Sequence, residues 1–147
     1  MMAATESEII YYWSEAAVPP PHHYEYEVRI QGDGRGEIRF WPDYPGGETP
    51  CWQISFSVAA EDVQGLFRLM RTRGLFTTPW RAAEEPPVGG SSEWITVRAE
   101  GRVVEVPACL PPEQQEAMSR IYQAVRGLVP VAIWTELEKR RRAYTRF

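Results

Sequence analysis

The residues best suited to chemistry in this sequence are two adjacent histidines, His22 and His23, in the segment PPPHHYEYE. Imidazoles bind metals and transfer protons near neutral pH. In an extended segment, however, adjacent side chains point in opposite directions, so both rings do not readily bind one ion. No Cys-x-x-Cys, His-x-x-x-His or Glu-x-x-His spacing supports a site with Cys51 or Cys109. The sequence therefore predicts no metal and no other cofactor.

Nucleophilic and acid–base catalysis have no clear signature. The sequence lacks a G-x-S-x-G motif. Most carboxylates fall on the polar faces of expected strands or at helix starts, where solvated charge explains them, and only their separation in the fold decides whether two form a catalytic pair. The two cysteines are interpreted as buried free thiols. We assign no catalytic residue from the sequence.

Three glycines in RIQGDGRGEIRF, residues 29–40, raise the alternatives of a phosphate-binding loop and a turn. A dinucleotide fingerprint needs G-x-G-x-x-G leading into a helix, whereas here the third glycine comes one residue early and a strand pattern follows. The segment is therefore interpreted as a β-hairpin. A loop over residues 31–35 sets Arg29 opposite Glu37 and Glu27 opposite Arg39. This register is electrostatically more favourable than that of a shorter loop, which sets Arg29 opposite Arg39.

The remaining patterns predict an α+β domain. Period-two alternation predicts a third strand over residues 52–58 and a second hairpin around Glu100 and Gly101, while apolar stripes predict helices ending near Gly74, opening at Pro111 and Pro112, and opening at Pro130. This order favours an antiparallel sheet of about five strands with two to three helices packed on one face. The whole chain, 1–147, is expected to be one domain, with 1–18 as an N-terminal extension and 130–147 as a C-terminal helix with a basic end.

Charge and hydropathy limit the possible partners. The formal net charge is −4, yet a basic run lies near the end of the chain. An acidic body repels nucleic acid and anionic membranes, so nucleic-acid contact is expected only through Lys139, Arg140, Arg141 and Arg142. The better interpretation of this run is a helix C-terminus at which basic side chains complement the helix dipole. No membrane span is expected, and EIIYYW is too short and too acidic in its flank to be a signal peptide. We expect a cytoplasmic protein.

Aromatic residues are the most informative surface candidates. Six tryptophans exceed what the core of such a domain requires. In the hairpin register above, Trp41 falls on the outward face of its strand, close in sequence to Asp43 and Tyr44 and to the segment His22, His23 and Tyr24. These six residues are the candidate binding residues. An exposed cluster would suit a protein partner or ligand, but a sheet face covered by the N-terminal segment would give the same pattern.

The stretch PPPHHYEYEVRIQGDGRGEIRFWPDYP, followed by FSVAAEDVQGLFRLMRTRGLF and a late strand pair with a closing helix, resembles a family of small bacterial proteins of unknown function. Its members share a hairpin with a D-G turn, a third strand and a helix ending near G-L-F. The likeness covers residues 19–128. It implies the fold described above and no reaction. Some relatives are lipoproteins, and this sequence departs from them in lacking a lipobox cysteine.

Two classes of function remain open. The first is a non-enzymatic protein-interaction or regulatory module, such as an immunity-like or adaptor protein, that binds a partner or a second copy through the outer sheet face or the aromatic edge. The second is a small-ligand-binding domain or an enzyme with an aromatic-lined pocket between helix and sheet, closed by loop 42–50 or 81–92. A flat outer face bearing Trp41 and Tyr44 would favour the first class.

Overall fold

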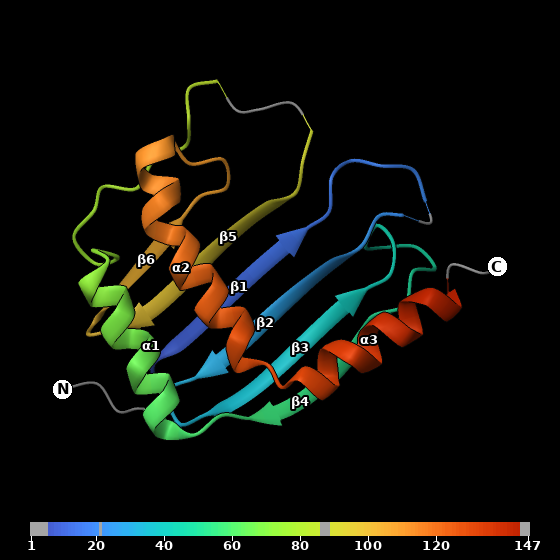
Figure 1. Cartoon of the computed structure of the whole chain (residues 1–147), viewed down its shortest axis with the longest axis horizontal. Helices are drawn as coiled ribbons and strands as arrows, with labels where there is room; N and C mark the ends of the chain where they lie inside the picture. Colours follow the sequence, from blue (N-terminus) through green and yellow to red (C-terminus); the bar gives the residue numbers. More distant parts are fainter. Residues whose placement is uncertain (1–5, 21, 86–88, 145–147) are drawn as a thin grey trace.

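The computed structural model describes residues 6–20, 22–85 and 89–144. Its elements in chain order are β1 (Glu8–Ser14), β2 (Glu25–Gln31), β3 (Arg35–Trp41), β4 (Trp52–Ser57), α1 (Ala60–Thr72), β5 (Ser92–Ala99), β6 (Arg102–Val106), α2 (Pro112–Leu128) and α3 (Val131–Tyr144). The strands form one antiparallel sheet in the order β4-β3-β2-β1-β5-β6. All three helices lie on the same face of this sheet (Figure 1). The α+β fold predicted from the sequence is confirmed, with six strands in place of about five.

The hairpin register is confirmed. Arg29 lies opposite Glu37 and Glu27 lies opposite Arg39. The loop after β2 needs one of its glycines for a physical reason, because Gly34 has a φ of +94° and a Cβ atom there would lie 2.1 Å from the Val58 carbonyl oxygen. Only glycine fits a left-handed turn that approaches another backbone so closely.

The N-terminal extension expected for residues 1–18 is wrong for its central part, because Glu8–Ser14 forms β1 in the middle of the sheet. This strand pairs with β2 on one side and with β5 on the other. The run EIIYYW gives no period-two signal, since both faces of the strand carry large apolar side chains. The alternation is hidden because Ile10 and Tyr12 place apolar side chains on the outer face of β1, where a strand with one polar face would carry polar ones.

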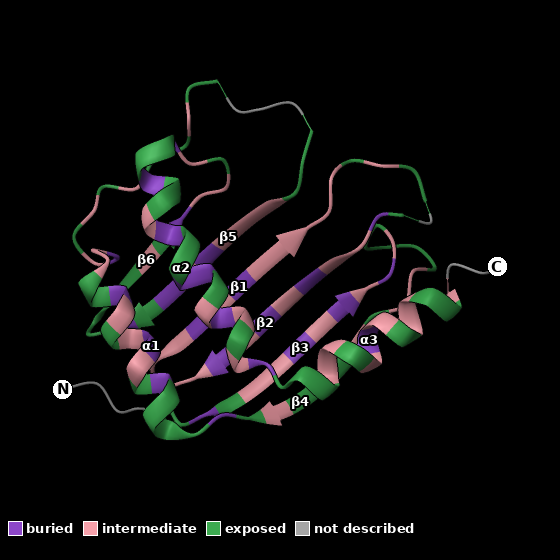
Figure 2. Ribbon diagram, in the orientation of Figure 1, coloured by how far each residue is buried: buried purple, intermediate pink, exposed green. Residues whose placement is uncertain are grey.

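The core lies between the inner sheet face and the helices (Figure 2). Alternate strand residues such as Val28, Ile38 and Val97 are fully buried there, and they meet the apolar stripes of α1 and α2. The expected helix positions agree with α1, α2 and α3, and Pro112 stands in the first turn of α2, where a missing amide costs nothing. In the described part of the chain, none of the helices has the length and apolar character needed to cross a membrane.

Both cysteines are exposed, so the expectation of buried thiols is wrong. Cys51 lies in the loop that leads into β4, and Cys109 lies in the segment between β6 and α2. Cys109 has a φ of +59°. Neither position belongs to the inner face of the sheet or to an apolar helix stripe, and these are the places that bury a thiol.

Candidate functional site

The outer face of the sheet carries charged and aromatic side chains, and in the described residues all three helices lie on the other side (Figure 1). Its charges form a ladder along β2 and β3. Arg29 Nε donates to Glu27 at 2.7 Å, and Arg39 Nε donates to Glu37 at 2.9 Å. These ion pairs leave the face close to neutral locally while keeping it polar.

Three aromatic residues interrupt this polar face, and we call them the aromatic strip: Tyr12 of β1, Trp41 of β3 and Trp94 of β5. The rings of Tyr12 and Trp94 are stacked with centroids 5.3 Å apart, and Tyr12 and Trp41 have centroids 6.1 Å apart. All three residues are half-buried. An open hollow borders Trp94 and is also lined by Trp80, Arg81, Thr96, Glu105 and Pro107. The strip therefore crosses four strands on the sheet face that no described helix covers.

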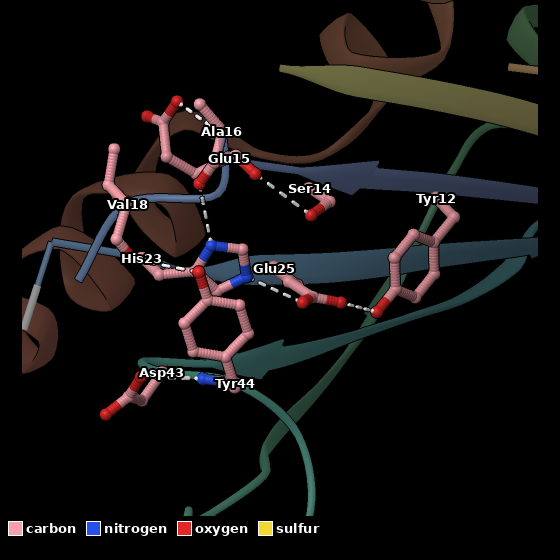
Figure 3. A network of polar contacts seen from close by, with 9 residues as sticks. All are labelled: Tyr12, Ser14, Glu15, Ala16, Val18, His23, Glu25, Asp43 and Tyr44. Carbon is pink, nitrogen blue, oxygen red and sulfur yellow. Dashed lines mark hydrogen bonds and ion pairs between the residues drawn. The ribbon is translucent and has the colours of Figure 1, made fainter. Parts of the chain in front are cut away.

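A polar network anchors one end of the strip (Figure 3). The Tyr12 hydroxyl donates to Glu25 Oε1, and the other oxygen of Glu25 lies 2.6 Å from His23 Nε2. The second ring nitrogen of His23 lies 3.0 Å from the Ala16 carbonyl oxygen. The His23 ring also stacks on Tyr44 at 3.7 Å, and the Tyr44 hydroxyl donates to the Val18 carbonyl oxygen at 2.8 Å. We call Tyr12, His23, Glu25 and Tyr44 the clamp.

The clamp positions groups rather than reacting with them. His23 is 2 % exposed, and its two ring nitrogens face the Ala16 carbonyl and the Glu25 carboxylate, so neither nitrogen is directed to solvent. Burial, reinforced by the hydrogen bond to Glu25, raises the pKa of Tyr12 well above its usual range. The Tyr12 phenol thus stays protonated as a donor, and the clamp ties the segment before β2 to the loop after β3.

The six candidate binding residues divide between the two sheet faces. Trp41 lies in the aromatic strip, Tyr44 is 41 % exposed at its end, and Asp43 accepts a hydrogen bond from the Tyr44 amide at 2.7 Å. His23 is buried in the clamp. His22 is exposed in a turn before β2, where its amide donates to the Pro19 carbonyl oxygen at 3.1 Å.

Tyr24 lies on the inner face, apart from the other candidates. Its ring packs against Trp13 and Phe40 and lies under the Arg141 guanidinium, which is 4.6 Å from the ring centroid. It borders a hollow of about 350 Å³ between the sheet and α3 that is lined also by Tyr26, Phe40, Arg126, Trp134, Leu137 and Glu138. Its described lining includes no residue of loop 42–50 or 81–92, one of which was expected to close an aromatic-lined pocket.

Beside that hollow, Arg126 of α2 binds Tyr11 and Glu93. Arg126 Nη1 donates to the Tyr11 hydroxyl at 2.6 Å and to Glu93 at 3.1 Å, and the Tyr11 hydroxyl donates to the same carboxylate oxygen at 2.6 Å. Burial is the largest cause that raises the pKa of Tyr11 far above its usual range. These contacts attach α2 to the sheet, and the Arg126 charge is neutralised by Glu93.

Metal and nucleic-acid binding gain no support from the geometry. Among residues 6–20, 22–85 and 89–144, no three His, Cys, Asp or Glu side chains gather as a metal site would require. In the basic run, Arg140 pairs with Glu136, and Arg141 and Arg142 both pair with Glu138. These i,i+3 and i,i+4 pairs agree with the helix-terminus interpretation. Contact with nucleic acid through this run stays a prediction.

Three residues of the site were not among the sequence candidates: Tyr12, Glu25 and Trp94. Trp94 has a signal in the sequence, because Ile95 and Val97 are inward and the residue before them must face outward. Tyr12 has none, since EIIYYW does not alternate. Glu25 is one of several acids on a polar strand face, and only its position between Tyr12 and His23 distinguishes it.

Comparisons with known proteins do not assign this chain to a family. No protein-family model matches the chain, and no curated protein is significantly similar to it in sequence. The resemblance to small bacterial proteins therefore stays a prediction.

Proposed function

We infer that this protein is an interaction module that binds a folded protein partner through the outer face of its sheet, in a regulatory or adaptor role such as that of an immunity protein. The observation that carries this inference is the aromatic strip: Tyr12, Trp41 and Trp94 lie across a face that no described helix covers. Trp and Tyr are the residues that most often dominate protein–protein binding energies. The cytoplasmic location expected from the sequence belongs to this proposal.

The clamp makes the strip suitable for binding. Tyr12 is held by Glu25 and stacked on Trp94, so its ring loses little freedom when a partner covers it. Binding is stronger when the contacting side chains are ordered beforehand, because about 0.5–1.5 kcal/mol is otherwise lost for each immobilised side chain. The surrounding ion pairs, such as Arg39 with Glu37, form a polar rim of the type that surrounds the apolar centre of an interface.

The size of the face also suits a folded partner. Five spacings between six strands at about 4.8 Å, and seven residues at about 3.3 Å, give a surface of roughly 24 by 23 Å. With the exposed Tyr44 loop added, this approaches the ~800 Å² that each side of an ordinary interface buries. A short peptide would cover only part of the strip.

Site-specific photo-cross-linking tests the proposal. A photoreactive amino acid at Thr96, next to the strip, is compared with one at Gln64 on α1, and the proteins captured in a lysate of the source cells are identified and purified. The proposal expects one protein captured through Thr96 and absent from the Gln64 control, and this protein must bind the purified chain with 1:1 stoichiometry. Capture through Gln64 alone, or no binding after purification, would contradict it.

The inner hollow supports a second candidate function, the binding of a small aromatic ligand. Its volume of about 350 Å³ lies within the range of small-molecule sites, and its walls are mainly aromatic. Native mass spectrometry of gently purified protein distinguishes the two functions. Excess mass that disappears in a Phe40→Leu variant supports ligand binding, whereas a bare chain of calculated mass supports the interaction module.

A further inference from the structure

Strand β4 (Trp52–Ser57) is an open edge of the sheet. The Val58 amide donates to the Gly34 carbonyl oxygen at 2.8 Å, one position beyond Arg35–Ser57 at the end of the β3–β4 ladder, so this amide points toward β3. Hydrogen-bonded and non-hydrogen-bonded pairs alternate in an antiparallel ladder. The N–H and C=O groups of Gln53, Ser55 and Ser57 therefore point away from β3, toward the free side of the strand, and all three residues are exposed.

This edge lacks the features that usually protect an edge strand. Charged side chains, proline, bulges or very short strands prevent edge-to-edge pairing in most sheets. The outward side chains of β4 are Gln, Ser and Ser, and its apolar side chains Trp52, Ile54 and Phe56 are only half-buried. The opposite edge, β6, has five residues, and by the same alternation its free groups belong to Val103 and Glu105, one of them charged.

We propose that β4 pairs with β4 of a second copy of this chain, antiparallel across a twofold axis through Ser55, to give one continuous twelve-stranded sheet. This inference rests on the edge strand alone and does not depend on the proposed partner of the outer face. In this register Ser55 lies opposite Ser55 of the second copy, and Gln53 lies opposite its Ser57. All three outward residues of each copy then form hydrogen-bonded pairs, with two hydrogen bonds in each pair.

The side chains of β4 match a second copy in this register. A twofold axis perpendicular to the sheet keeps the inner face of both copies on the same side, so Ile54 lies opposite Phe56 of the second copy on the helix face. Apolar cross-strand pairs of this kind stabilise a sheet. On the outer face, small uncharged Ser and Gln side chains meet each other, so no like charges face each other across the seam.

The nearest charges do not oppose the pairing. On the outer face they lie on β3, where Glu37 is opposite Ser55 and Arg39 is opposite Gln53. Three strand spacings, or about 14 Å, separate these residues from those on β3 of the second copy. This distance exceeds the screening length of about 8 Å at physiological ionic strength. Two identical strands bring identical charges toward each other, so self-pairing requires that no like charges lie close across the seam.

Sedimentation of the purified chain tests the proposal. We expect a dimer that dissociates on dilution, and we expect Ser55→Pro to be monomeric at concentrations where the unaltered chain is dimeric, with a dissociation constant at least 100-fold higher. The amide of Ser55 points away from β3 and has no partner among the described residues, so proline at this edge position should leave the fold intact, which circular dichroism verifies. Ser55→Thr is the matched control and retains the dimer. A monomeric unaltered chain, or a dimer unaffected by Ser55→Pro, would overturn the proposal.

Disulfide trapping tests the register independently of the proline variant. In a background with Cys51→Ser and Cys109→Ser, Ser55→Cys is expected to form a cross-linked dimer under mild oxidation, because paired Cα atoms lie about 5.5 Å apart, within disulfide reach. Gln53→Cys is expected to cross-link with Ser57→Cys in a mixture and not with itself, since four residues separate the two copies of Gln53 along the seam. Self-cross-linking of Gln53→Cys without that of Ser55→Cys would overturn the register.

Discussion

The two faces of the sheet both carry stacked aromatic rings, yet only one face is covered. On the inner face Tyr26 contacts Tyr11, Trp13, Phe40 and Trp134, and it is 6 % exposed beneath α2 and α3. On the outer face, which no described helix covers, Tyr12 stacks on Trp94 and lies tilted against Trp41 at a similar centroid spacing. The comparison shows that the same residue types serve stability where they are covered, and we infer that they serve binding where they are not.

The largest expected effect is on the inner face. Tyr26→Ala removes a ring that touches four others, so it should lower the free energy of unfolding by about 3–5 kcal/mol, as truncation of buried aromatic residues does. Urea unfolding followed by circular dichroism measures this change. A loss below about 1 kcal/mol would mean that the inner cluster does not hold the helices on the sheet.

Alkaline pH should weaken the inner face next. Burial raises the pKa of Tyr26 to about 12, and it also raises the pKa of Tyr122 well above the usual value. Above pH 10 the unfolded chain releases these protons while the folded chain retains them, so stability is intact below pH 10 and is lost as the pH rises. For Tyr26 the loss by pH 12 is on the order of 2–3 kcal/mol.

Absorbance titration of the phenolate and urea unfolding between pH 8 and 12 together check the effect of pH. Titration of all tyrosines in one step near pH 10, without loss of structure, would contradict the burial of the inner rings.

The clamp should contribute less to the free energy of unfolding than the inner core does. His23→Ala removes one of the two hydrogen-bond partners of Glu25 and the ring on which Tyr44 stacks. We expect the free energy of unfolding to fall by about 1–3 kcal/mol, as it does when a buried hydrogen-bonding group loses its partner. Hydrogen exchange should show faster exchange in the loop that carries Tyr44 and unchanged exchange in α1. Faster exchange throughout the chain would mean that His23 supports the core and not only this end of the outer face.

The aromatic strip should contribute least to folding. Trp41→Ala and Trp94→Ala each remove one cross-strand aromatic contact from a half-buried position, so each should cost only about 1 kcal/mol of stability. Thermal unfolding of both variants measures this cost. A loss as large as that for Tyr26→Ala would place the strip in the core and would remove the contrast between the two faces.

The sequence predicts the fold well where side chains alternate and poorly where they do not. For β2 and β3, two conditions predicted the register: apolar residues of both strands must face the core, and opposite charges such as Arg29 and Glu37 must be paired. The strand Glu8–Ser14 was missed because Ile10 and Tyr12 place apolar side chains on its outer face, which interrupts the alternation. That omission concealed Tyr12, and with it the aromatic strip.

The clamp lies beyond sequence reasoning for a different reason. Trp41 and Tyr44 were found because the alternation of β3 shows that Trp41 faces outward, and Tyr44 follows it closely in the sequence. The stacking of Tyr44 on His23 instead depends on how the loop after β3 folds back on the segment before β2. Neither loop has a repeating pattern, so only the folded chain shows that His23 is buried and His22 is not.

The central claim is tested most directly by one paired measurement on the Trp41→Ala, Trp94→Ala double variant. Calorimetric titration gives its affinity for the partner captured through Thr96, and thermal unfolding gives its stability. We expect the variant to remain folded and to bind this partner at least 30-fold more weakly, equivalent to about 2 kcal/mol. Unchanged affinity in the folded variant would contradict the assignment of the outer face as the binding surface.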